Sequence, residues 1–307
     1  MRIAVMGSGG VGGYFGAKLA NGGADVTFIA RGAHLDAMRK NGLRIDSTHA
    51  PLELPKVKAT DDPSTIGKVD MILFTVKLWD TESAAKSLVS TIGPDTGLIS
   101  FQNGVQKDDM LRPIVGDKAL IGGTSYIAAS IKGPGVIAHT GVNQRLVFGE
   151  FDKSKSGRVE EFHKACVAGG ITAEISPDIG VEIWQKFVFL VGMSGATASM
   201  RATAGEIRSN PLTRQFMLDL MKEVVAVGRA RGINLPADYA EQRIAFIDTL
   251  PAEMVASMYG DLKQGKPLEL PWLSGGVVDL GAAVNVPAPM NRAVRDVLAL
   301  YAKGKTA

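Results

Sequence analysis

The sequence is poor in cysteine, and this scarcity limits what the protein can be. Its 307 residues include one cysteine, Cys166, so no internal disulfide can form. A buried, unreactive thiol in an amphipathic helix over 158–168 fits a reducing compartment. The apolar N-terminal segment is too short and too rich in glycine to span a bilayer, and no charged region of a signal sequence precedes it. We therefore expect a cytoplasmic protein without a membrane segment.

Histidine and clustered charge are equally scarce. The four histidines stand apart, and no pair of histidines or cysteines has the spacing of metal ligands, which predicts no metal site. The net charge of +3 comes from scattered lysines and arginines, without the basic run or aromatic stripe of a nucleic-acid binder. A mildly positive chain suits anionic small molecules instead.

What the sequence has is a complete βαβ pattern in its first thirty-two residues. An apolar run of buried-strand type, 2–6, leads directly into Gly7-Ser-Gly-Gly-Val-Gly12. Small and apolar residues at helical spacing follow over 13–20, and glycines end that helix. Residues 25–30 then form a second strand. The chain therefore predicts a strand, a glycine turn, a helix and a strand in succession.

The three spaced glycines of this turn are typical of dinucleotide binding. Gly7 permits a tight turn, Gly9 lets the backbone approach a pyrophosphate, and Gly12 allows the helix to pack closely on the strand. The helix N-terminus supplies N–H donors and a positive dipole. A glycine-rich turn in another kind of α/β protein is the alternative, which the flanking strand and helix make the weaker interpretation.

The end of the second strand bears on the choice of cofactor. A unit that prefers NAD carries an acidic residue there for the ribose 2′-hydroxyl. This chain has Ala30 followed by Arg31, whereas Asp25 begins the strand. Arg31 favours a 2′-phosphate and hence NADP(H). A solvated loop arginine is the alternative.

The rest of the chain divides into an α/β part and a helical part. An unbroken apolar run over 69–76 is typical of a central parallel strand, and 97–101 predicts its neighbour. A possible strand is expected over 51–59, and β-type runs over 119–150 predict the far edge of the sheet. We predict a Rossmann-type, mainly parallel, doubly wound sheet in a domain over 1–177, and an all-helical domain over 178–307. The cleft between two such domains is the default ligand site.

Lys186 is the most distinctive ionisable residue of the helical part. It stands alone in the apolar stretch Trp184-Gln-Lys-Phe-Val-Phe-Leu-Val191. Burial lowers the pKa of a lysine toward neutrality, which suits a proton donor. A lysine that snorkels from the helix edge, or that pairs with Glu182 one turn earlier, explains the pattern equally well.

Several motifs together resemble one known family. They are the glycine turn with Arg31, Thr75-Val-Lys77, Gln102-Asn103-Gly104, Glu182-Ile-Trp-Gln-Lys186, Gly205-Glu-Ile-Arg208 and Leu268-Glu-Leu270. In order and spacing, over nearly the whole chain, they resemble the ketopantoate reductase (2-dehydropantoate 2-reductase) family.

This resemblance implies roles for individual residues. Lys186 matches the general acid of the family, and Glu269 matches the acidic residue near that lysine and the cofactor ribose. Asn103 matches a residue that contacts cofactor and substrate, and Ser257 matches a serine that binds substrate. Lys77 and Arg31 match the positions that hold the NADP 2′-phosphate. The remaining implied cofactor contacts are Gly7, Ser8, Gly9, Gly10, Val11, Gly12 and Ala128. Without the resemblance, Glu269 reads as a loop carboxylate.

Departures from the family pattern concern the substrate. The substrate-side positions four and eight residues after Lys186, usually asparagine in the family, are Leu190 and Ser194. Ala204 replaces another family asparagine, and Pro271 replaces an acidic residue. Hydroxyl-binding sites can discriminate by ~10⁴-fold or more, so these changes bear on specificity.

Three hypotheses follow. The first is an NADPH-dependent reductase of a small 2-oxo acid, with ketopantoate as the family default. The second is a related enzyme that reduces a more apolar ketone or an imine. The third is an NADPH-binding sensor without turnover. Nucleic acid and membrane are not expected partners, and the apolar helices of the second domain are compatible with a homodimer.

Overall fold

The computed structural model describes residues 1–305 and divides the chain into two compact units. The first comprises Met1–Asn103 and Lys107–Glu182, and the second comprises Gly104–Gln106 and the chain from Ile183 onward. The boundary falls inside helix α6 (Ile179–Met200). Each unit is described by itself.

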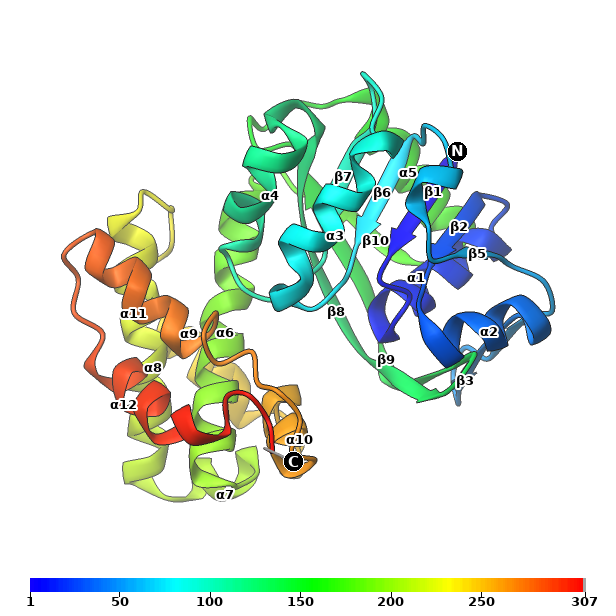
Figure 1. The fold of residues 1–307 in the computed structure, drawn as a ribbon. Helices are drawn as coiled ribbons and strands as arrows, with labels where there is room; N and C mark the ends of the chain where they lie inside the picture. Colours follow the sequence, from blue (N-terminus) through cyan, green and yellow to red (C-terminus); the bar gives the residue numbers. More distant parts are fainter. Residues whose placement is uncertain (306–307) are drawn as a thin grey trace. The chain divides into compact units, whose positions relative to one another are not determined.

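A mixed sheet forms the centre of the first unit (Figure 1). The strand order is β4-β3-β9-β8-β7-β6-β1-β2-β5, and β10 pairs with β9. Strands β1, β2, β5, β6 and β7 run parallel, whereas β8 and β9 form an antiparallel hairpin. The strands are β1 (Arg2–Met6), β2 (Asp25–Ile29), β3 (Leu43–Ser47), β4 (Leu52–Leu54), β5 (Lys58–Thr60), β6 (Met71–Phe74), β7 (Gly97–Ser100), β8 (Leu120–Gly133), β9 (Val136–Gly149) and β10 (Thr172–Ile175).

The strand order reverses at β1, which has β2 on one side and β6 on the other. The chain therefore leaves β1 and β6 in opposite directions at their carboxyl ends. Open parallel sheets bind ligands at such a switch point. The glycine turn begins there, directly after Met6.

Helices cover both faces of this sheet (Figure 1). Because side chains alternate along a strand, Ile3 and Val5 of β1 face one core while Ala4 and Met6 face the other. The first core packs against α1 (Gly10–Asn21), α2 (Gly32–Asn41) and α5 (Gly157–Ala168), and the second against α3 (Thr81–Leu88) and α4 (Lys107–Val115). This two-faced burial explains why β6 is uniformly apolar, and it confirms the predicted fold class.

Two parts of the predicted sheet were wrong. The hairpin β8–β9 is not the far edge, because β9 also pairs in parallel with β3 and β10. The possible strand over 51–59 is two short strands, β4 and β5, which lie at opposite edges of the sheet. Both errors concern pairing between segments far apart in sequence, which a local hydrophobic pattern does not encode.

The second unit is helical in its described residues, as predicted (Figure 1). Its helices after α6 are α7 (Ala204–Ser209), α8 (Pro211–Ala230), α9 (Tyr239–Asp248), α10 (Ser257–Lys263), α11 (Ser274–Ala283) and α12 (Pro289–Leu298). Within residues 1–305, no helix combines the length and the apolar character that a bilayer crossing requires.

The Gly205-Glu-Ile-Arg208 motif serves this helical packing. Thr203 and Glu206 form a reciprocal capping box at the start of α7. Arg208 donates to the carbonyls of Ile247 (3.0 Å) and Leu250 (2.6 Å), at and just beyond the end of α9. A cation at a helix C-terminus satisfies otherwise unpaired carbonyls. Of the two charged residues of this motif, Glu206 caps α7 and Arg208 joins α7 to the end of α9.

Candidate functional site

Two of the three spaced glycines in the turn leave no room for a side chain, whereas the third leaves room. Gly7 has a φ of 92°, and a Cβ there would lie 2.7 Å from the backbone nitrogen of Val76. A Cβ at Gly12 would collide with the carbonyl of Gly7 and the hydroxyl of Thr75. At Gly9, by contrast, a Cβ would meet no atom within 4 Å. Gly7 and Gly12 are required by packing, whereas the space above Gly9 is open.

The start of α1 suits an anion. Gly9 is its N-cap and provides no side chain to cap the helix, and the first turn carries no acidic residue. The first N–H groups of a helix have no intrahelical partner and lie at the positive end of the helix dipole. Ser8 does not compete with an anion for these N–H groups, because its buried hydroxyl donates to the Ile29 carbonyl at 3.0 Å. The residues present therefore fit a dinucleotide pyrophosphate.

Strand β8 borders this turn. A Cβ at Gly10 would run into the carbonyl oxygen of Ala129. The neighbouring Ala128 is exposed and lies at an irregularity in the β8–β9 pairing, where the register shifts after Ile127. The structure thus places Ala128 one residue from the contact between the glycine turn and β8.

Arg31 and Lys77 belong to two loops that meet through an ion pair. Arg31 precedes α2 with its side chain 79% exposed, and its Nη2 lies 3.5 Å from the Oδ2 of Asp80. Lys77 follows β6, and its Nζ lies 5.6 Å from the ring centroid of Trp79. Asp80 therefore joins the loop after β2 to the loop after β6. An exposed pair of this kind contributes little to stability, so Arg31 can exchange partners readily.

Asn103 follows β7 at the same edge of the sheet. It is half-buried and belongs to the first unit. The preceding Gln102 is buried and donates from its Nε2 to the Val76 carbonyl at 2.9 Å. Thr75 in turn donates to the carbonyl of Gly7 at 2.7 Å. Hydrogen bonds thus join three of the predicted cofactor segments: the glycine turn, the Lys77 loop and the Asn103 loop.

His34 also belongs to this cluster, although its sequence position looked isolated. Its Nδ1 accepts from the N–H of Gly135 at 3.1 Å, so its Nε2 is the protonated nitrogen and donates to the Ser8 carbonyl at 2.9 Å. Burial lowers the pKa of this imidazole below its usual value, and the Ser8 carbonyl opposes that shift. A neutral His34 therefore links α2, the glycine turn and the residue before β9.

The other predicted residues lie in the second unit. Lys186, Leu190 and Ser194 follow one another at four-residue intervals on α6, which places them on one helix face. Lys186 and Leu190 are half-buried, whereas Ser194 is fully buried. Within the described residues the hydroxyl of Ser194 has no hydrogen-bond partner. A buried hydroxyl without a partner is unusual in a folded protein.

Glu269 and Ser257 are positioned by the packing around α6 and α11. Glu269 is 5% exposed and stands between the buried Leu268 and Leu270. Its carbonyl accepts from the N–H of Trp272 at 3.0 Å, in the turn that leads to α11. Ser257 is the first residue of α10, and the N–H of the preceding Ala256 donates to Thr197 of α6 at 3.4 Å. Glu269 is thus a buried acid rather than a loop carboxylate in solvent.

Sequence reasoning missed Asp80, Thr75 and Gln102. Asp80 carried a signal, since it lies three residues after Lys77 in the segment that follows β6. Thr75 and Gln102 were part of motifs used for the resemblance, but a hydrogen bond between two strand ends has no local sequence signature.

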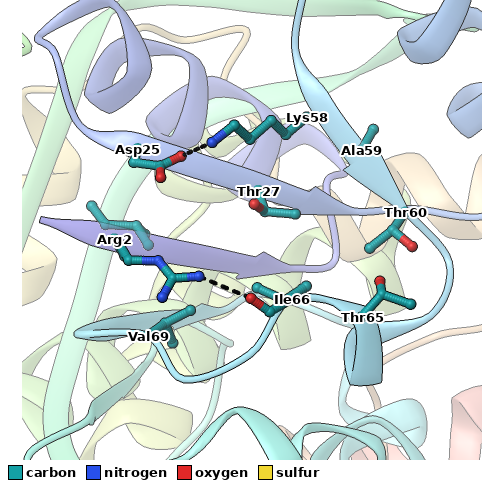
Figure 2. A pocket seen from close by; sticks show the side chains of 10 residues that line it. Arg2, Asp25, Thr27, Lys58, Ala59, Thr60, Thr65, Ile66 and Val69 are labelled. Atoms are coloured by element: carbon teal, nitrogen blue, oxygen red, sulfur yellow. Dashed lines mark hydrogen bonds and ion pairs between the residues drawn. The ribbon is translucent and has the colours of Figure 1, made fainter.

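A hollow of about 380 Å³ lies elsewhere on the first unit (Figure 2). Its charged side chains already have partners in the protein. Lys58 donates to Asp25 at 2.6 Å, and Arg2 donates to the Ile66 carbonyl at 2.9 Å. Arg2 and Asp25 are the first residues of β1 and β2, whereas the glycine turn follows the opposite end of β1. Among the described residues, these charged side chains of the hollow are therefore already hydrogen-bonded within the protein.

Comparisons with known proteins agree with the fold. The family model "Ketopantoate reductase PanE/ApbA" matches residues 3–153, and its C-terminal counterpart matches 178–302. A 2-dehydropantoate 2-reductase of Archaeoglobus fulgidus is 30% identical, with 97% of this chain and 96% of the relative aligned. A crystal structure of a PanE/ApbA family ketopantoate reductase from Ralstonia eutropha JMP134 superposes with a TM-score of 0.89 at 31% identity, covering 98% of both chains. D-mandelate dehydrogenase with NADH and anilino(oxo)acetate also superposes (TM-score 0.89, 98% of both chains), but at 20% identity it shows the fold alone.

The fold, the family match and these relatives define a nicotinamide-dinucleotide-dependent oxidoreductase that acts on a CH–OH group. Within this class, the chain belongs to the ketopantoate reductase PanE/ApbA family.

Proposed function

We propose that the protein is an NADPH-dependent reductase of a 2-oxo acid, with 2-dehydropantoate as its substrate and pantoate as its product. Residues 1–177 would bind the cofactor and 178–307 the substrate. The observation that carries this proposal is the helix face of α6, where the half-buried Lys186 is followed by Leu190 and the buried Ser194. A cytoplasmic setting and a homodimer stay predictions from the sequence.

Each residue has a defined task in this proposal. NADPH, when bound, supplies the hydride that reduces the ketone carbon. Lys186 donates a proton to the developing alkoxide, and Glu269 orients that lysine. The uncapped start of α1 and Arg31 with Lys77 bind the phosphates. Asn103 contacts cofactor and substrate, and Ser257 and Ser194 contribute hydroxyls to the substrate side. The burial of Glu269 and the unpaired hydroxyl of Ser194 support these roles.

A more apolar ketone or an imine is the second candidate substrate. Leu190 supplies a branched apolar side chain one turn after Lys186, and Ala204 is fully buried where the family usually has asparagine. A pocket that loses amide groups loses its discrimination in favour of hydroxylated substrates. The same hydride donor and the same lysine would serve either substrate.

A panel of 2-oxo acids distinguishes these functions. The purified protein would be mixed with NADPH and with ketopantoate, 2-oxoisovalerate or phenylglyoxylate, and the loss of NADPH absorbance would be followed. We expect turnover, with the highest kcat/KM for ketopantoate. A clear preference for phenylglyoxylate or 2-oxoisovalerate would support the second candidate. NADPH binding without oxidation across the panel would contradict a 2-oxo acid reductase and favour a sensor.

A further inference from the structure

The first unit contains a fully buried lysine that the proposed chemistry does not use. Lys107 is 1% exposed, and its ammonium group has three acceptors: the carbonyls of Ser100 (2.7 Å) and Gly123 (3.0 Å) and the carboxylate of Asp108 (3.2 Å). An ammonium group has three N–H donors, so its hydrogen-bonding capacity is fully used. Asp108 is 4% exposed and lies in the first turn of α4, where a negative charge is favourable.

The two carbonyls show what Lys107 does for the sheet. The β7–β8 pairing ends at Ile99 and Ile121, so Ser100 and Gly123 lie beyond the last paired residues. Buried carbonyls without partners cost about 1–3 kcal/mol each. Lys107 satisfies both and holds the diverging strands β7 and β8 together. Burial lowers the pKa of the Lys107 amine, and the Asp108 carboxylate opposes this.

Gln102 continues the same buried network toward β6. Its Oε1 accepts from the Ser100 hydroxyl at 2.9 Å. Its Nε2 donates to the Val76 carbonyl and to the Thr81 hydroxyl, both at 2.9 Å. Val76 and Thr81 stand immediately before and after the loop 77–80, which carries Lys77 and Asp80. One amide therefore holds both ends of that loop, and the next residue in the chain is Asn103.

We propose that Gln102 and Lys107 are positioning residues of the cofactor site, which set the Lys77 loop and the Asn103 loop in one fixed geometry through the buried network Val76–Gln102–Ser100–Lys107–Gly123. This inference rests on the proposed function, because it assigns NADPH contacts to Lys77 and Asn103. It adds that neither loop is placed independently. A substitution of Gln102 should therefore alter recognition of the 2′-phosphate, although Gln102 itself does not contact the phosphate in this proposal.

The test is a double-mutant cycle on cofactor selectivity. Dissociation constants for NADPH and NADH would be measured by fluorescence titration in wild type, Gln102→Leu, Lys77→Ala and the double variant. Gln102→Leu is expected to lower the preference for NADPH about tenfold, the effect of one displaced charge-assisted hydrogen bond. In the Lys77→Ala background the same change should have no further effect on that preference.

Thr96→Val provides a matched control. The buried hydroxyl of Thr96 donates to the Val69 carbonyl. Thr96 and Val69 precede β7 and β6, whereas Gln102 and Val76 follow these two strands. This variant should lower the melting temperature but leave the ratio of the two dissociation constants unchanged. A purely structural role for Gln102 predicts the same behaviour for Gln102→Leu.

A second variant tests Lys107 and does not depend on the folding of Gln102→Leu. Replacing both members of a buried ion pair with apolar side chains is tolerated better than removing one. Lys107→Met combined with Asp108→Leu should weaken NADPH binding about threefold, and this effect should vanish in an Asn103→Ala background.

The outcomes separate the two proposals. Non-additive effects on selectivity at Gln102 and Lys77, with an unchanged ratio for Thr96→Val, support the inference. If wild type binds NADPH but the effects of Gln102→Leu and Lys77→Ala add in the double variant, the inference is overturned and the proposed function stands. A wild type that binds neither dinucleotide overturns the proposed function, and the inference falls with it.

Discussion

The two units would serve the proposed function by different means. The first would offer mainly backbone to a dinucleotide: an uncapped helix start, the open space at Gly9 and strand ends held by partly buried hydrogen bonds. The second offers side chains on one face of α6, together with the buried Glu269. A backbone site depends on glycine and packing, whereas a side-chain site can change its substrate by single substitutions. The cofactor half should therefore tolerate little change, and the substrate half should be adjustable.

The largest effect is expected within the glycine turn. In Gly12→Ala the new methyl group would press on the Gly7 carbonyl, so we expect a loss of stability of about 1–3 kcal/mol and at least a hundredfold weaker NADPH binding. In Gly9→Ala the methyl group enters open space, so the melting temperature should stay near wild type while NADPH affinity falls. Thermal unfolding and fluorescence titration check both variants. Equal melting temperatures for the two variants would contradict the distinction between packing and ligand glycines.

The next effect concerns Arg31. Arg31→Ala removes a charge-assisted contact with the predicted 2′-phosphate, so the preference for NADPH over NADH should fall about 10- to 100-fold. The affinity for NADH should change little, because the exposed ion pair with Asp80 contributes little to stability. Competitive titration with the two cofactors measures this ratio. An unchanged ratio would show that the phosphate is not bound at Arg31.

A smaller effect is expected on the side-chain half. Leu190→Asn restores an amide one turn after Lys186, and it should raise kcat/KM for ketopantoate relative to 2-oxoisovalerate by about tenfold. Cofactor affinity should not change, since the substitution lies in the second unit. Steady-state kinetics with both acids provide the comparison. An unchanged ratio of the two kcat/KM values would place Leu190 outside the substrate pocket, and a shift toward 2-oxoisovalerate would contradict the proposed role of an amide at this position.

The smallest effect concerns pH. Burial lowers the pKa of His34, so the unfolded chain takes up this proton more readily than the folded protein. The stability that His34 contributes is thus present above pH 6.5 and is lost as the pH falls through the lowered pKa. At pH 7.5, His34→Gln should cost about 1–2 kcal/mol through its two hydrogen bonds, and the gap to wild type should narrow on acidification. Thermal unfolding of wild type and His34→Gln from pH 7.5 to 5 measures this difference in stability. A difference that stays constant over this range would contradict the titration of His34.

The sequence predicted those features that are local in the chain. The βαβ unit, the apolar strand over 69–76 and the helix that carries Lys186 each leave a periodic pattern, and the structure confirms them. The pairing of β3 with β9 leaves no such pattern, because Arg44 pairs with Val136, which lies 92 residues further along the chain. The pattern also conceals the burial of Lys107, since the carbonyls of Ser100 and Gly123, which supply two of its three acceptors, belong to two different strands.

The candidate site divides in the same way. The glycine turn follows from residue chemistry alone, whereas the role of Glu269 came from the family resemblance. Its burial depends on the turn before α11, which no pattern around Leu268 and Leu270 predicts. The contacts of Asp80 with Arg31 and of His34 with the Ser8 carbonyl connect these two residues to the predicted cofactor site, and only the structure shows these contacts.

The central claim is that Lys186 donates the proton during reduction by NADPH. The most direct measurement is kcat for ketopantoate at saturating NADPH in wild type and Lys186→Met, with Lys222→Met as a control for loss of a helix lysine, here one that pairs with Glu241. We predict that Lys186→Met lowers kcat about 10²- to 10⁴-fold while the dissociation constant for NADPH stays within about twofold of wild type. If wild type oxidises NADPH with ketopantoate and Lys186→Met retains the full rate, Lys186 is not the proton donor and the proposed mechanism is contradicted.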